Sequence, residues 1–153
     1  MRKFHIVEGF EGKAKLPVRA TEGSAGYDIC VINDTPKTIR PGETYKFHTG
    51  IAVEMEKDEL FIINIRSSVG INRNLVLANT QAYIDSDFYP NEIILALTNI
   101  GQVSRIVESN ERVAQGIFIK YLTLETEEKS KKKRKGGIGS TNEPKENEEG
   151  IAA

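Results

Sequence analysis

Two carboxylates in the middle of the chain are the residues best placed by type and spacing to do chemistry. Asp85 and Asp87 stand two apart in the segment Asn79-Thr-Gln-Ala-Tyr-Ile-Asp-Ser-Asp-Phe-Tyr-Pro-Asn-Glu92, so an extended strand would put them on one face. A carboxylate beside a phosphate can deprotonate or orient a water, or hold Mg²⁺. The rings of Phe88 and Tyr89 suit a flat base or a sugar. Ordinary turn chemistry is the alternative, because Asp and Asn often cap turns.

Two further segments carry groups that suit phosphate. In Asn64-Ile-Arg-Ser-Ser-Val-Gly70 an arginine and two hydroxyls follow an apolar strand, and such groups can hold phosphate oxygens. Helix capping by Ser67 or Ser68 is the alternative. Arg134-Lys-Gly-Gly-Ile-Gly-Ser-Thr141 is a strip of backbone donors behind a basic run, which can wrap a polyphosphate. It lacks the ending of a P-loop, and a linker or a localisation patch would have the same composition.

Two shorter segments carry weaker signals. Gln115 ends the segment Asn110-Glu-Arg-Val-Ala-Gln115 and stands in an otherwise apolar run. A buried amide needs partners, so Gln115 either braces the core or meets a ligand. Asp28 follows a glycine at the start of a strand in Ser24-Ala-Gly-Tyr-Asp-Ile29, which by itself is an ordinary turn-to-strand entry.

The elements that must position these groups are predicted to be β-strands. Short apolar or alternating runs recur between turn signals, and no long window keeps a helical period. One short helix is expected near Ser67–Ile71. This pattern is typical of an all-β sandwich, jelly roll or barrel. The predicted strands are Phe4–Val7, Tyr27–Ile32, Thr44–Phe47, Ile51–Met55, Leu60–Ile65, Leu75–Ala78, Ile93–Leu97 and Val113–Leu124.

Composition narrows the class of protein. The chain has 153 residues, which suits one domain, and its 21 basic and 22 acidic residues argue against a broadly basic nucleic-acid binder. A single cysteine excludes an internal disulfide and a multi-cysteine zinc site. No apolar stretch approaches the ~20 residues that span a bilayer, and no signal-peptide run begins the chain. A cytoplasmic protein without a membrane segment is therefore expected.

The C-terminal part has a different composition from the rest. Charges fill 14 positions of residues 125–150, where Ile138 is the one apolar residue. Such a segment cannot bury enough apolar surface to offset its ordering entropy. We therefore expect a β-domain over residues 1–124, a flexible basic glycine-rich arm over 125–142 and a disordered acidic tail over 143–153.

Taken together in chain order, the five segments resemble the five motifs of the homotrimeric deoxyuridine triphosphate nucleotidohydrolases (dUTPases). The resemblance extends from Ala25 to Thr141. It implies a jelly-roll subunit in a threefold trimer, with active sites built from parts of all three chains. It also implies that the glycine-rich arm closes over a site formed by its neighbours, and that the reaction converts dUTP to dUMP and pyrophosphate.

The resemblance implies a role for each matched residue. Asp85 would be the general base that activates a water against the α-phosphorus, and Gln115 would help to position phosphate or water. Phe88 would pack on the deoxyribose and exclude a ribose. Mg²⁺ would be held mainly by the triphosphate and waters, with Asp28 at most in its outer shell. The implied contacts are Arg66, Ser67 and Ser68 to the phosphates, Asn79 with the backbone of Tyr83 and Ile84 to uracil, Arg134, Gly139, Ser140 and Thr141 to the β- and γ-phosphates, and Ile138 over the base.

The chain departs from the family pattern at several of these positions. Ser68 and Ala82 stand where glycine is usual, and Ile138 stands where a phenylalanine usually stacks on uracil. The arm has one residue between its arginine and its first glycine where two are common, so Lys133 is an alternative to Arg134.

The third motif is one residue longer than usual. It runs Phe88-Tyr-Pro-Asn-Glu92 where the family has Tyr-x-Gly-Glu. Either Phe88 or Tyr89 is therefore the gate against ribose. The spacing from Asp85 favours Phe88.

Two alternative functions remain open. A dCTP deaminase shares some of these elements but needs a glutamate three residues before an asparagine on the following strand, and counting back from Asn99 reaches Ala96. A non-enzymatic regulatory or binding module is the other alternative, with the basic run Lys129–Lys135 on nucleic acid. Acidic flanks neutralise that run, so nucleic-acid binding is not expected.

Overall fold

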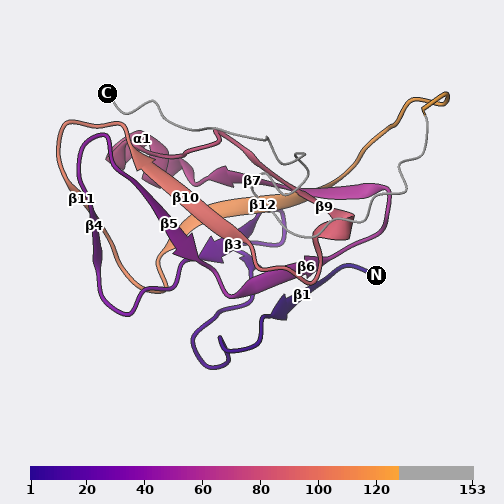
Figure 1. The fold of residues 1–153 in the computed structure, drawn as a ribbon, viewed down its shortest axis with the longest axis horizontal. Coiled ribbons are helices and arrows are strands. Elements are labelled where there is room, and N and C mark those ends of the chain that lie inside the picture. Colours follow the sequence, from indigo (N-terminus) through magenta and orange to yellow (C-terminus); the bar gives the residue numbers. More distant parts are fainter. Residues whose placement is uncertain (128–153) are drawn as a thin grey trace, which may run out of the picture.

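A computed structural model describes residues 1–127 of the chain, and the regular secondary structure of this part consists of β-strands with one short α-helix and one 3₁₀ turn (Figure 1). The all-β prediction is confirmed, and so is the single short helix near Ser67. The elements in chain order are β1 (Lys3–Ile6), β2 (Val18–Arg19), β3 (Tyr27–Cys30), β4 (Lys37–Ile39), β5 (Thr44–His48), β6 (Ile51–Glu54), β7 (Glu59–Ile65), α1 (Ser67–Arg73), β8 (Leu75–Leu77), β9 (Ala82–Asp85), a one-turn 3₁₀ helix (Ser86–Phe88), β10 (Ile94–Asn99), β11 (Arg105–Val107) and β12 (Arg112–Lys120).

The strands of the described part form four antiparallel sheets, of which the largest positions most of the predicted site residues found there. Its strand order is β2-β3-β12-β7-β9. A second sheet has the order β5-β10-β8, and the pairs β1–β6 and β4–β11 complete the set. Figure 1 shows β4 and β11 side by side at one end of the molecule, with β1 and β6 paired elsewhere on it. Residues distant in sequence thus meet mainly through the large sheet.

Buried and half-exposed side chains alternate along β7, and this alternation shows which face of the strand meets the core. Phe61 and Ile63 are fully buried and point into the core, whereas Leu60 and Ile62 lie on the other face and are half-exposed. The register pairs Ile62 with Ile117 and Leu60 with Ile119 of β12. We call the face that carries Leu60, Ile62, Ile117 and Ile119 the outer face of the large sheet.

The last predicted strand is shorter than the sequence indicates. The expected run to Leu124 ends at Lys120, because its partner strand β7 begins at Glu59, directly opposite Lys120. Leu122 is 98% exposed and Leu124 is 75% exposed. Apolar side chains beyond the ladder therefore lie in solvent within this single chain. In the described part, no helix is long and apolar enough to cross a membrane.

Candidate active site

A charged cluster brings together three of the five motifs. In chain order these are the first, second and fourth, and they contribute Asp28, Arg66 and Arg112. The Asp28 carboxylate is 6% exposed. Its Oδ1 lies 3.2 Å from Nε of Arg66, and its Oδ2 accepts a hydrogen bond of 3.1 Å from Nη1 of Arg112. Nη1 of Arg66 also donates to the carbonyl of Arg112 at 3.2 Å. Two guanidinium groups on one carboxylate leave a surplus positive charge, which suits a polyanionic ligand.

Sequence reasoning missed Arg112, although it stands within the segment chosen for Gln115. The available signal was an arginine three residues before that amide. Its partnership with Asp28 depends on the pairing of β12 with β3, which carries an irregularity between Arg112 and Ala114. A bulge of this kind re-aims a side chain, and the sequence pattern does not reveal it.

Gln115 lies beside this cluster. Its β-ladder partners are Asp28 on β3 and Asn64 on β7, so the three side chains share the outer face of the large sheet. Gln115 is exposed, which favours the ligand alternative over a role in bracing the core. Gly26 leaves room for the amide, because a Cβ at Gly26 would lie 2.6 Å from Oε1 of Gln115.

Ser67 and Ser68 lie in the first turn of α1, and both are exposed. Arg66 is the N-cap residue, and no side chain hydrogen-bonds the cap. The alternative in which a serine caps the helix is therefore not what the structure shows. The buried side chain of Val69 holds the turn against the core.

The segment predicted to read a base lies between β8 and β9. Thr80 has a φ of 62°, and the N–H of Gln81 donates to the carbonyl of Asn79 at 2.6 Å. Nε2 of Gln81 donates to Oδ1 of Asn64 at 2.8 Å, and the Tyr83 hydroxyl donates to Gln81 at 2.5 Å. This segment is thereby held beside the polar end of β7.

Strand β9 carries Tyr83, Ile84 and Asp85 along one edge of the large sheet, where β7 is its partner in the described part of the chain. Tyr83 is 61% exposed, whereas Ile84 packs against the core. Asp85 ends the strand opposite Leu60, and the 3₁₀ turn that ends at Phe88 follows directly.

One chain does not bring Asp85 to the charged cluster. Arg66 follows one end of β7, and Asp85 pairs with Leu60 near the other end. Six residue steps along a strand span roughly 20 Å. The predicted general base and the predicted phosphate ligands are therefore separated within a single subunit.

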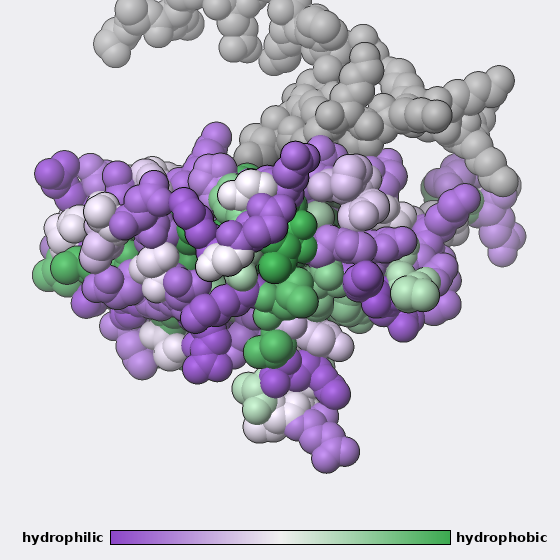
Figure 2. All heavy atoms as spheres, turned by 90° about the horizontal axis from the view of Figure 1, so that it is seen from below, coloured by the Kyte–Doolittle hydropathy of each residue, from purple (hydrophilic) through white to green (hydrophobic). Residues whose placement is uncertain are grey.

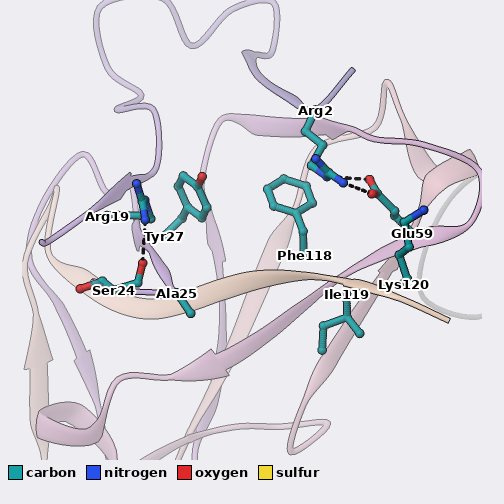
Figure 3. A pocket seen from close by; sticks show the side chains of 9 residues that line it. All are labelled: Arg2, Arg19, Ser24, Ala25, Tyr27, Glu59, Phe118, Ile119 and Lys120. Atoms are coloured by element: carbon teal, nitrogen blue, oxygen red, sulfur yellow. Dashed lines mark hydrogen bonds and ion pairs between the residues drawn. The ribbon is translucent and has the colours of Figure 1, made fainter. Parts of the chain in front are cut away.

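A cavity of about 300 Å³ lies near the first motif but away from these groups (Figure 3). Figure 3 shows Arg19 and Tyr27 on one side of it and the Arg2–Glu59 ion pair on the other. The hydrogen bond from Arg2 holds the pKa of the buried Glu59 carboxyl below its usual range. Of the predicted site residues within 1–127, none lines this cavity, whose walls are Arg2, Arg19, Ser24, Ala25, Tyr27, Glu59, Phe118, Ile119 and Lys120.

The predictions for the glycine-rich segment lie outside the described residues. They concern Lys133, Arg134, Ile138, Gly139, Ser140 and Thr141.

Comparisons with known proteins agree with the motif order. The family model described as dUTPase matches residues 12–142. A deoxyuridine 5'-triphosphate nucleotidohydrolase of Rickettsia felis is 36% identical over 143 residues, covering 91% of this chain and 95% of its own. One of Lactococcus lactis is 33% identical over 150 residues, covering 92% and 97%.

Solved structures give the same result. The crystal structure of a dUTPase from Streptococcus mutans matches with a TM-score of 0.73 and 30% identity, covering 80% of this chain and 98% of that one. The jelly-roll prediction is thereby confirmed. The family match spans most of the chain, including the segments that hold the Asp28 cluster and Asp85, so this chain belongs to the dUTPase family.

Proposed function

We propose that this protein hydrolyses dUTP to dUMP and pyrophosphate. Relatives named for this activity cover nine-tenths of the chain. The observation that carries the proposal is the register of the large sheet, which sets Asp28, Gln115 and Asn64 side by side next to Arg66. Three of the five matched motifs meet there, although they are scattered in sequence.

The proposed reaction is an in-line displacement at the α-phosphorus. Asp85 accepts a proton from a water whose oxygen attacks the phosphorus, and the bond to the bridging oxygen of the β-phosphate breaks. Arg66, with Ser67 and Ser68 in the first turn of α1, holds the phosphate oxygens. Chemistry of this kind depends on positioning and charge neutralisation. We add Arg112 to this set, because it shares Asp28 with Arg66.

Base and sugar selection would come from the segment around β9. Asn79 and the backbone near Tyr83 and Ile84 would read the uracil edge, and the narrow space would exclude the methyl group of thymine and the amino group of cytosine. Support comes from the position of β9 at the sheet edge, where backbone groups are available to a ligand. Phe88 would pack on the deoxyribose.

The active site is proposed to form between copies of the chain. The separation of roughly 20 Å along β7 is too large for one chain to bind the phosphates of a dUTP molecule and activate the water that attacks it. Between the two polar ends, the outer face carries three half-exposed side chains, Leu60, Ile62 and Ile117, and the exposed side chain of Ile119. Contact through this apolar face would join Asp85 of one copy to Arg66 of another. A threefold ring closes such a head-to-tail contact.

Figure 2 shows one side of the molecule with hydrophobic spheres exposed between hydrophilic ones. Exposed apolar area of this kind is common where subunits associate. The exposed large apolar side chains include Val18, Tyr83 and Ile119 from the large sheet. They support the proposal that the functional unit is an assembly.

Mg²⁺ is proposed to accompany the substrate, held mainly by its phosphates and by waters. The carboxylate oxygens of Asp28 are already paired, one with Nε of Arg66 and the other with Nη1 of Arg112, so this residue suits at most an outer-shell place. When bound, the ion would neutralise negative charge on the triphosphate.

The glycine-rich segment is proposed to cover the bound triphosphate, with Arg134 or Lys133, Gly139, Ser140 and Thr141 on the phosphates and Ile138 over the base. Ending the chain after Glu128 is expected to lower kcat/KM for dUTP by about 100-fold, because preorganised donors of this kind contribute that much or more. Size-exclusion chromatography and circular dichroism would check that the shortened protein keeps its assembly and fold. Full activity after truncation would contradict the role of this segment.

Gly26 provides a test of the Gln115 assignment. In Gly26→Ala, the new methyl group would displace the Gln115 amide, and kcat/KM for dUTP is expected to fall by roughly 10- to 100-fold, as misplaced contacts in active sites do. The matched control is Gly23→Ala, because nothing lies within 4 Å of a Cβ at Gly23. Equal activity of the two variants would remove Gln115 from the site.

A pyrophosphate-release assay with four nucleotides tests the proposed function. With Mg²⁺ present, we expect release from dUTP and not from dTTP, dCTP or UTP. Ammonia release from dCTP would instead support the deaminase alternative. Inactivity toward all four nucleotides would favour a non-enzymatic protein, and a salt-dependent gel shift with DNA would then indicate a nucleic-acid partner.

A further inference from the structure

The loop between Asp85 and Glu92 carries two adjacent aromatic rings, those of Phe88 and Tyr89. The Tyr89 ring lies 5.0 Å from the His5 ring, centroid to centroid. His5 is itself hydrogen-bonded to Glu54 of β6 at 2.9 Å. Tyr89 is thus packed on the β1–β6 pair, whereas Phe88 ends the 3₁₀ turn that begins directly after Asp85.

Asn91 closes the turn that begins at Phe88. The carbonyl oxygen of Phe88 accepts a hydrogen bond of 2.9 Å from the backbone N–H of Asn91 and one of 2.6 Å from its Nδ2. Two donors from one residue fix the orientation of the peptide group that follows Phe88. The extra residue of this motif is contained within this closed turn.

Glu92 anchors the end of the loop separately. Its Oε1 accepts from the backbone N–H groups of Thr49 at 3.1 Å and Gly50 at 2.8 Å. The buried Thr49 hydroxyl donates to the carbonyl of Ile93 at 2.7 Å. The loop is therefore fixed at Asp85 by the sheet and at Glu92 by this turn, and Asn91 restrains the part between them.

We propose that Asn91 is a positioning residue for sugar discrimination, and that it acts through Phe88. The inference rests on the proposed function and extends it to a residue in the segment where this motif is one residue longer than the family pattern. An apolar wall rejects an added hydroxyl by only about 100-fold, so the discrimination depends on the wall staying in place. The side chain of Asn91 holds the Phe88 backbone, and hence its ring, against the sugar.

The test compares kcat/KM for dUTP with the residual kcat/KM for UTP, which is measured by pyrophosphate release at high concentrations of the full-length protein. Asn91→Ala is expected to lower the dUTP-to-UTP ratio by roughly fivefold, the factor that one neutral hydrogen bond supports. Asn91→Asp, which keeps the size and removes the donor, is expected to lower it similarly. The matched control is Asn33→Ala. This change also removes a hydrogen bond from a side-chain amide to a backbone carbonyl, here that of Val107 at 3.0 Å. This control is expected to lower the melting temperature comparably and to leave the ratio unchanged.

Phe88→Ala and Tyr89→Ala complete the test. We expect Phe88→Ala to lower the ratio at least as much as Asn91→Ala, and Tyr89→Ala to leave it near the wild-type value. An unchanged ratio in both Asn91 variants, or a loss that follows Tyr89 in place of Phe88, would overturn the inference while the proposed function stands. Absence of dUTP turnover in the wild-type protein would overturn both.

Discussion

Asp85→Asn is expected to lower kcat for dUTP by about 1,000-fold, within the range that general acid–base catalysis contributes. An amide is nearly the same size as a carboxylate and still forms hydrogen bonds, but it cannot accept the proton of the attacking water. Binding of a non-hydrolysable dUTP analogue, measured by calorimetry, is therefore expected to stay within about threefold of wild type. A loss confined to kcat is the signature of a group that acts in the transition state.

The control for this variant is Asp34→Asn, which makes the same change of charge at a side chain that is 92% exposed and is paired with Lys13. It is expected to keep wild-type turnover. If Asp85→Asn turns over dUTP as fast as this control, Asp85 is not the base. If it loses analogue affinity by the same factor as kcat, Asp85 binds substrate and does not activate water.

Gly116→Ala is expected to lower the free energy of unfolding more than Gly26→Ala or Gly23→Ala does. A Cβ at Gly116 would lie 2.2 Å from Cζ and 2.4 Å from Cε1 of Phe61. The Phe61 ring is fully buried and is packed against Phe118 and Phe4, with centroids 4.8 and 5.4 Å away, so it has no free space to move into. Overpacking of this kind costs about 3 kcal/mol or more. Chemical denaturation would measure the loss.

Two further variants check that the cause is this contact. Gly23→Ala adds a methyl group where no atom lies within 4 Å and is expected to leave the free energy of unfolding within about 0.5 kcal/mol of wild type. Phe61→Leu in the Gly116→Ala background is expected to recover part of the loss, because neighbours in contact are not additive. A wild-type denaturation midpoint for Gly116→Ala would contradict the packing account.

The strand pattern was predictable from sequence because it depends on apolar alternation, which is local. The predicted strand Leu60–Ile65 lies within β7, where Ile63 is buried in the core and Ile62 is half-exposed on the outer face. The end of β12 was not predictable, because Leu122 and Leu124 continue the apolar pattern after the partner strand has ended. Where a strand stops depends on its neighbour.

The candidate site was predictable in its residue types and less so in its contacts. By its sequence alone, Asp28 stands at an ordinary strand entry. In the fold its carboxylate pairs with Arg66 and Arg112, which lie 38 and 84 positions away in the chain. Gly26 makes room for the side chain of Gln115, and Gly116 makes room for the ring of Phe61. Both partners lie far away in the sequence, so composition and periodicity do not predict these contacts. The separation of Asp85 from Arg66 likewise follows only from the register of β7 with β9.

The central claim is that dUTP is hydrolysed at a site to which one copy of the chain supplies Asp85 and another supplies Arg66. Co-expression of Asp85→Asn with Arg66→Gln, each inactive by itself, tests it by pyrophosphate release from purified mixed assemblies. Random assortment in a closed ring leaves about a quarter of the sites with both native residues, so the mixture is expected to recover about a quarter of wild-type activity. If verified mixed assemblies stay as inactive as the two parent variants, the shared site is contradicted.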